Sequence, residues 1–124
     1  MSKMKNKIFI GIFLIFTSIG LISMKPVKAY DPSGNWNYEI EAGEEILSGL
    51  MTIKKVKDLY EVEVNSNVYG MLILDNVKFN KTNLTANVDV QGINTDFDMD
   101  FDKDSMSGTV TYDGQELPLS GQRK

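Results

Sequence analysis

Residues 94–102, Asn-Thr-Asp-Phe-Asp-Met-Asp-Phe-Asp, decide the fold class of this chain. Phe97, Met99 and Phe101 alternate along it with aspartates at 96, 98, 100 and 102. Successive side chains of a β-strand point to opposite faces, whereas a helix would scatter both sets around its circumference. The stretch therefore predicts a strand with one face in a core and the other in water.

The same alternation extends outward from this stretch in both directions, and turn residues separate the alternating runs. Asp113-Gly114 is the strongest turn signal, because a type I′ hairpin turn needs two residues at positive φ. The sequence predicts eight strands, at 35–42, 46–55, 59–65, 68–80, 83–91, 93–102, 105–112 and 115–123. The fourth of these is long enough to bend at Asp75-Asn76.

Sequential strands joined by short turns form an antiparallel up-and-down meander. An open meander has two edges that invite aggregation, and closure into a barrel removes both. An eight-stranded barrel is just wide enough to be filled by side chains or to hold one small ligand. We therefore expect an all-β fold, an eight-stranded meander closed into a small barrel whose interior is mostly filled.

Residues 1–29 have the layout of a cleavable secretory signal peptide. Lysines precede an apolar stretch over residues 8–22, and Val27-Lys28-Ala29 offers compact residues at the cleavage site. The alternative is a membrane anchor, but a span needs about 20 apolar residues and this stretch is shorter. Cleavage after Ala29 would leave a short link over 30–34 and one β-barrel domain over 35–124, secreted or periplasmic.

Charge is unevenly distributed between the predicted leader and the rest of the chain. The first 29 residues hold five of the 13 Lys and Arg and none of the 17 Asp and Glu, so residues 30–124 carry a net charge of −9. Such a surface repels nucleic acid and anionic lipid, so we expect neither nucleic-acid nor membrane partners after leader removal. Solubility is the simplest role of the charge, and we expect a monomer; attraction of cations or a basic partner is the alternative.

Both ends of the predicted domain carry a pattern known from other barrels. Gly34-Asn35-Trp36 opens the first strand and Arg123 ends the last, and alternating strand directions bring Trp36 and Arg123 to the same end. The chain resembles the lipocalins and other calycins, and more specifically small exported calycin-like domains of bacteria. The resemblance implies a barrel closed by Gly34, Trp36 and Arg123, with the guanidinium over the indole. The chain departs from true lipocalins in being much shorter and in lacking a helix.

Several kinds of chemistry are excluded by the residues that the chain lacks. It has no His and no Cys, which removes His-based catalytic triads, the commonest zinc ligands and disulfides. The aspartates of residues 96–104 do not suit calcium, because alternate strand residues are about 6.6 Å apart while Ca²⁺ needs ligands at about 2.3–2.6 Å. We therefore expect no catalytic residue, no metal and no cofactor.

A non-enzymatic binding module is the leading hypothesis, with a small apolar or amphipathic ligand at the barrel mouth opposite Trp36. Strand alternation places these side chains near that mouth: Ile46, Tyr69, Met71, Ile93, Tyr112 and Leu117. Tyrosine suits such a position because it offers apolar area and a hydroxyl, although core packing explains inward methionines and aromatics equally well. The alternatives are a protein partner, such as a secreted protease inhibited through residues 30–33, and a structural surface component with a filled core.

Overall fold

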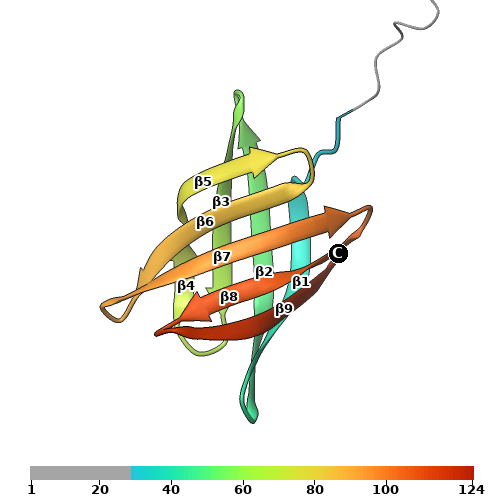
Figure 1. Cartoon of the computed structure of the whole chain (residues 1–124). Helices are drawn as coiled ribbons and strands as arrows, with labels where there is room; N and C mark the ends of the chain where they lie inside the picture. Colours follow the sequence, from blue (N-terminus) through green and yellow to red (C-terminus); the bar gives the residue numbers. More distant parts are fainter. Residues whose placement is uncertain (1–28) are drawn as a thin grey trace, which may run out of the picture.

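A computed structural model describes residues 29–124; the predicted signal peptide, apart from Ala29, lies outside the described residues. Nine strands form one antiparallel sheet in the order β4-β3-β2-β1-β9-β8-β7-β6-β5, as Figure 1 shows. Their bounds are β1 Gly34–Ala42, β2 Glu45–Val56, β3 Leu59–Ser66, β4 Gly70–Ile73, β5 Asp75–Asn80, β6 Asn83–Val90, β7 Ile93–Asp102, β8 Ser105–Tyr112 and β9 Gln115–Arg123.

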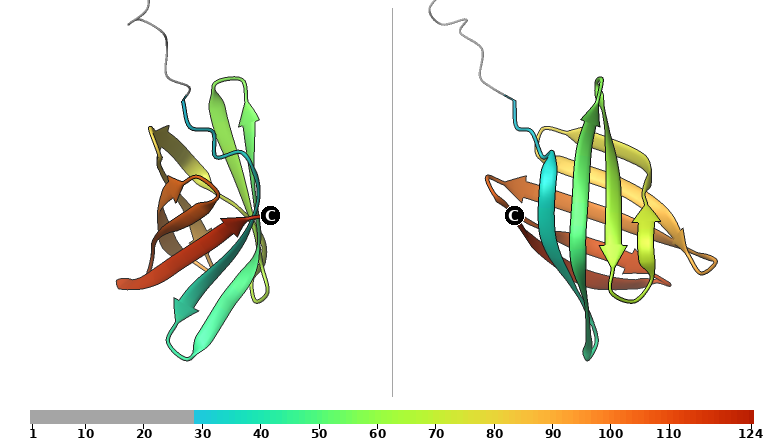
Figure 2. Two further views of the ribbon diagram at one scale, coloured as in Figure 1. Left: turned by 90° about the vertical axis from the view of Figure 1, so that its right-hand side faces the viewer. Right: turned by 180° about the vertical axis from the view of Figure 1, so that it is seen from behind.

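The sheet curls into a nearly closed barrel. Strands β1–β4 form one side and β5–β9 the other, and the two sides cross at a steep angle (Figure 2). The two sides are joined where β1 pairs with β9, with Trp36 opposite Arg123 and Ile40 opposite Leu119. The predicted all-β antiparallel barrel with up-and-down order is therefore confirmed.

The number of strands differs from the prediction because the expected strand 68–80 is divided. Leu74 separates β4 from β5; its side chain is buried, and its N–H donates to the carbonyl of Val62 at 3.0 Å. Just beyond it, Asn76 has a φ of 54° and the register with β6 shifts between Asp75 and Lys78. A bulge bends a strand locally, so the chain leaves β3 here and turns toward β6.

The core follows the alternation that the sequence predicts. Phe97, Met99 and Phe101 are at most 4% exposed, while the aspartates between them face solvent. Side chains directly opposite on neighbouring strands share a face, and the cross-strand partner of Phe97 on β8 is the buried Val110. Burial of one face on every long strand supplies the main stabilisation of a domain that has no disulfide.

One end of the barrel is closed around Trp36. Its ring is fully buried, lies 5.1 Å from the ring of Phe101 in an edge-to-face arrangement, and donates Nε1–H to the carbonyl of Pro32 at 2.9 Å. The Cζ atom of Arg123 lies 4.5 Å from the centre of the indole. The expected packing of Arg123 over Trp36 is thus present, a cation–π contact at the junction of the first and last strands.

The guanidinium of Arg123 also holds the N-terminal link. It forms an ion pair with Asp104 at 2.8 Å and donates to the carbonyls of Ser33 and Asp31 and to the hydroxyl of Tyr30. That hydroxyl in turn donates to the carbonyl of Lys103. The link, the β7–β8 turn and the last strand are therefore tied together, and together they cover this end of the barrel.

Replacing Trp36 should strongly destabilise the domain. We expect Trp36→Ala to lower the free energy of unfolding by about 3–5 kcal/mol, because it removes a fully buried aromatic ring and leaves a cavity. Urea denaturation followed by circular dichroism measures the change. Leu59→Ala is the matched control: Leu59 is 72% exposed, so its loss should change stability by no more than about 0.5 kcal/mol. Equal effects of the two variants would contradict closure at Trp36.

Candidate functional site

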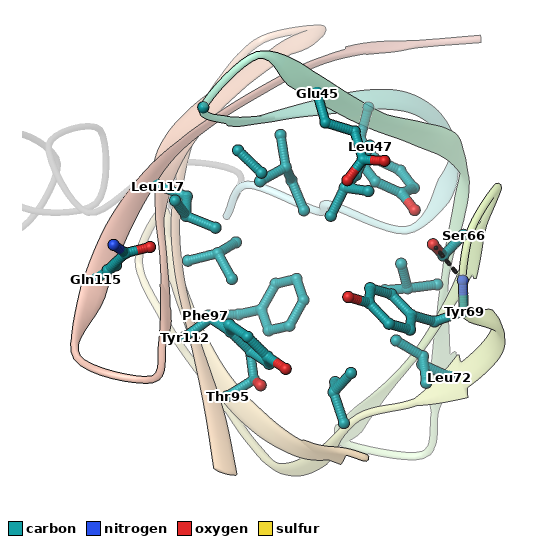
Figure 3. Close-up of a pocket in the computed structure, with 17 residues that line it drawn as sticks. Glu45, Leu47, Ser66, Tyr69, Leu72, Thr95, Phe97, Tyr112, Gln115 and Leu117 are labelled. Carbon is teal, nitrogen blue, oxygen red and sulfur yellow. Dashed lines mark hydrogen bonds between the residues drawn. The ribbon is translucent and has the colours of Figure 1, made fainter. Parts of the chain in front are cut away.

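A pocket of about 300 Å³ opens at the end of the barrel opposite Trp36. It lies where β1, β6 and β8 end and β2, β7 and β9 begin, and Figure 3 shows it surrounded by side chains from both sides of the barrel. Its wall is mainly aliphatic and aromatic, and includes Tyr38, Ile40, Leu47, Val64, Leu72, Val90, Phe97, Val110 and Leu117. Pockets for small ligands span about 300–1,000 Å³, so this one suits a small occupant.

The inner part of the pocket is made by core residues. Val64, Phe97 and Val110 are nearly fully buried; Val64 and Val110 lie two residues before the ends of β3 and β8, and Phe97 lies four residues after the start of β7. Beyond them toward Trp36, the interior is filled by residues such as Met51 and Met99, which have no exposed surface. The expectation of a filled interior therefore holds for the closed half, while the open half is hollow.

A turn places Tyr69 at the pocket. The Ser66 hydroxyl oxygen accepts hydrogen bonds from the N–H groups of Val68 at 3.1 Å and Tyr69 at 3.0 Å. Asn67 fixes the same turn to β2, because its N–H donates to the carbonyl of Ser48 and its side-chain oxygen accepts from the N–H of Ser48. The ring of Tyr69 is consequently held over the cavity by a braced turn (Figure 3).

Tyr112 enters the pocket from the end of β8. Its neighbours across the sheet are Thr95 on β7 and Gln115 on β9, which also line the pocket. Within residues 29–124, neither the hydroxyl of Tyr112 nor that of Tyr69 has a hydrogen-bond partner. Both hydroxyls point toward the pocket in Figure 3, so both are available to a polar group of an occupant.

The other polar groups in the wall are already engaged or lie at the rim. The Tyr38 hydroxyl donates to the carbonyl of Asn65 at 3.1 Å, and the Thr95 hydroxyl donates to the carbonyl of Ile93 at 3.2 Å. Glu45 and Gln115 lie at the exposed rim. A polar contact inside the pocket would therefore fall on Tyr69 and Tyr112.

Three of the residues that the sequence analysis placed at the mouth line the pocket together: Tyr69, Tyr112 and Leu117. Ile93 lies outside the lining set. It shares a face with Thr95 and Phe97, but it is the first residue of β7 and only half-buried beside the Gln91-Gly92 turn.

Met71 and Ile46, which the sequence analysis placed near the mouth, are exposed and do not line the pocket. Met71 is 57% exposed and lies opposite Asn65, an outward residue of β3, whereas its neighbour Leu72 lies opposite the buried Val64. The turn before Gly70 interrupts the alternation, so Tyr69 and Met71 do not share a face. Ile46 is 51% exposed because the inward residues of β2 are odd-numbered, including Leu47 and Met51.

Leu47 and Leu72 also line the pocket, although the sequence analysis did not place them at the mouth. The inward residues of β2 are odd-numbered and extend from Met51 to Leu47, so strand alternation was a usable signal for Leu47. Leu72 had no such signal, because its orientation depends on the turn at residues 67–69. The pocket wall thus includes apolar residues of β2 and β4 that the sequence alone did not place there.

Two features are absent from the described part of the chain: a cluster of metal-ligating side chains and a helix that could span a membrane. Among residues 29–124, no three acidic side chains come together closely enough to hold a metal ion. In the same range, no helix has the length and apolar character that a membrane span requires.

Burial raises the pKa of Tyr38 above its ordinary value of 10.0, and this predicts alkaline instability. Above pH 10.0 the phenol of the unfolded chain ionises, while the folded state keeps its proton. The unfolded state is then favoured, so the free energy of unfolding falls as pH rises. Tyr38→Phe removes this contribution, and wild type should therefore lose more stability than the variant between about pH 8 and about pH 10.5.

Urea denaturation of both proteins at the two pH values measures the difference. Burial also raises the pKa of Tyr30 and Tyr60, but these contributions are common to both proteins and cancel. Equal losses of stability in wild type and Tyr38→Phe would show that folding does not raise the pKa of Tyr38.

Comparison of the chain with models of known protein families gives no match, and comparison with curated proteins gives none either.

Proposed function

We propose that this chain is an exported, non-enzymatic binding module that holds one small apolar or amphipathic ligand in the pocket at the open end of the barrel. The observation that carries the proposal is the pairing of an apolar cavity of about 300 Å³ with two tyrosine hydroxyls that have no hydrogen-bond partner among residues 29–124. Ligand sites combine a mainly apolar wall with a few polar groups that fix orientation, and this pocket has both.

The apolar wall would supply most of the binding free energy. Burying apolar surface stabilises a complex by roughly 25 cal/mol per Å², before the loss of translational and rotational freedom is subtracted. Because Ser66 and Asn67 brace the turn that carries Tyr69, little additional ordering is needed on binding. A hydroxyl, amine or amide of the ligand could bond Tyr69 or Tyr112 without displacing an existing hydrogen bond.

The nearly closed antiparallel barrel is compatible with a calycin-like fold, and the contact of Trp36 with Arg123 agrees with that proposal. Calycin-like barrels place ligands inside the barrel at one end, as proposed here. The absence of His and Cys from the whole chain supports a binding role over nucleophilic or His-dependent catalysis.

The alternative roles have less support. Protease inhibition was assigned to residues 30–33, but the side chain of Arg123 bonds Tyr30, Asp31 and Ser33 and holds that segment against the closed end. A segment so held is not free to extend into a protease cleft. A structural component with a filled core would not need the hollow at the open end.

A neutral amphiphile should bind and stabilise the protein. With 1-octanol at about ten times its Kd, we expect roughly 1.4 kcal/mol of stabilisation, which corresponds to a rise of several degrees in melting temperature. Isothermal titration calorimetry and thermal unfolding followed by circular dichroism measure the two effects. Lack of both would contradict the proposed function.

Two neighbouring residues on β4 provide a matched pair of variants. Leu72→Gln places an amide in the pocket wall and should weaken octanol binding at least tenfold, whereas Met71→Gln changes an outward side chain and should retain wild-type affinity. Circular dichroism first establishes that each variant is folded. Equal weakening in both variants would show that the ligand binds elsewhere.

The proposed export rests on the sequence of residues 1–29 and has its own test. Protein recovered from the host should begin at Tyr30, because the apolar stretch and the compact residues before position 30 suit signal peptidase. Intact-mass spectrometry of the secreted fraction measures this directly. A full-length product retained in the cell membrane would contradict it.

A further inference from the structure

We infer that the pocket selects amphiphiles with a positively charged head group and disfavours anionic ones; this inference rests on the proposed ligand-binding function. The reason is a separation of charge between the two ends of the barrel. Among residues 29–124, the open end of the barrel carries acidic residues and no lysine or arginine. The apolar pocket opens at this end.

The basic residues all belong to the closed half. They occur in the turns that follow β2, β5 and β7, on the strand segments beside those turns, and at the end of β9. The two ion pairs formed within residues 29–124, Lys54–Glu63 and Arg123–Asp104, are in this half as well. Positive charge is therefore kept away from the pocket.

The acidic residues of the open half surround the pocket entrance. They lie in the β1–β2 and β8–β9 turns, on the ends of strands that adjoin these turns, and at the end of β6: Glu41, Glu44, Glu45, Asp89, Asp113 and Glu116. Within the described residues none of them has a cationic partner. Charges of one sign around a low-dielectric cleft add to a field that attracts cations and repels anions.

Glu45 places one of these negative charges in the pocket wall itself. It is the one charged residue in the pocket lining, and Figure 3 shows its carboxylate turned toward the cavity. The aromatic rings of Tyr38, Tyr69, Phe97 and Tyr112 form part of the same wall. Ring faces attract cations within about 6 Å, so an ammonium group at this mouth would find a carboxylate, aromatic rings and two tyrosine oxygens.

An anionic head group would find the opposite conditions. The rings present negative faces, the rim is acidic, and a carboxylate entering the pocket would lose water without gaining a cationic partner. The tyrosine hydroxyls could each donate one hydrogen bond, but they would not offset the repulsion. A neutral alcohol should therefore bind with intermediate affinity.

A series that shares one alkyl chain and differs only in its head group tests the inference: octylamine, 1-octanol and octanoate, titrated at pH 7 and low salt. We expect octylamine to bind roughly five- to tenfold more tightly than octanol, and octanoate to bind more weakly than octanol. Raising NaCl from about 50 mM to about 0.5 M should reduce the preference for octylamine, because salt screens exposed charges.

Glu45→Gln should lower the ratio of octylamine affinity to octanol affinity. The control is Glu61→Gln, which should preserve this ratio because Glu61 is an exposed residue of β3 outside the pocket lining.

Equal affinities for the three compounds, or tightest binding of octanoate, would overturn the charge selectivity while leaving the pocket as a ligand site. Failure of all three to bind would overturn the proposed function and the inference with it.

Discussion

The pairing of β1 with β9 is the contact on which the rest of the structure depends. Every other strand pair joins neighbours in the chain, whereas this one joins residues 36–40 to residues 119–123. Without it, the two sides of the barrel would be connected through Leu74 and the side-chain packing alone. Trp36 and Arg123 lie opposite each other at one end of this pairing, so the indole, the guanidinium and the N-terminal link reinforce it where it would otherwise fray.

This closure divides the interior into two halves with different roles. Near Trp36 the aromatic rings pack edge to face, with Phe79 6.3 Å from Phe101 and 5.2 Å from Tyr60, and Trp36 itself is fully buried. At the opposite end the strands carry smaller or shorter side chains inward, such as Ala42, Ser66 and Thr95, and the pocket opens between them. The packed half of the barrel near Trp36 thus stabilises the fold, while the open half holds the pocket.

The sequence predicted most of this fold because the alternation is regular wherever one strand face is buried. Residues 93–102 have the same bounds in the prediction and in the structure, and so do residues 105–112 and 115–123. The expected bend at Asp75-Asn76 is present, with Asn76 at positive φ just after Leu74, but the prediction was wrong at Met71, whose orientation is reversed by the turn before Gly70. Such breaks depend on tertiary packing, and only the pocket residues on uninterrupted strands, Tyr112 and Leu117, followed directly from strand alternation.

The pairing of the two ends of the chain also governs when the molecule can fold. Contacts between residues far apart in sequence form slowly, and barrels dominated by them fold in milliseconds to seconds. Because β1 completes its pairing on β9, a chain that emerges with its N-terminus first cannot close until about residue 123 is available. During that interval one edge of β1 has no strand to pair with, so the barrel remains open.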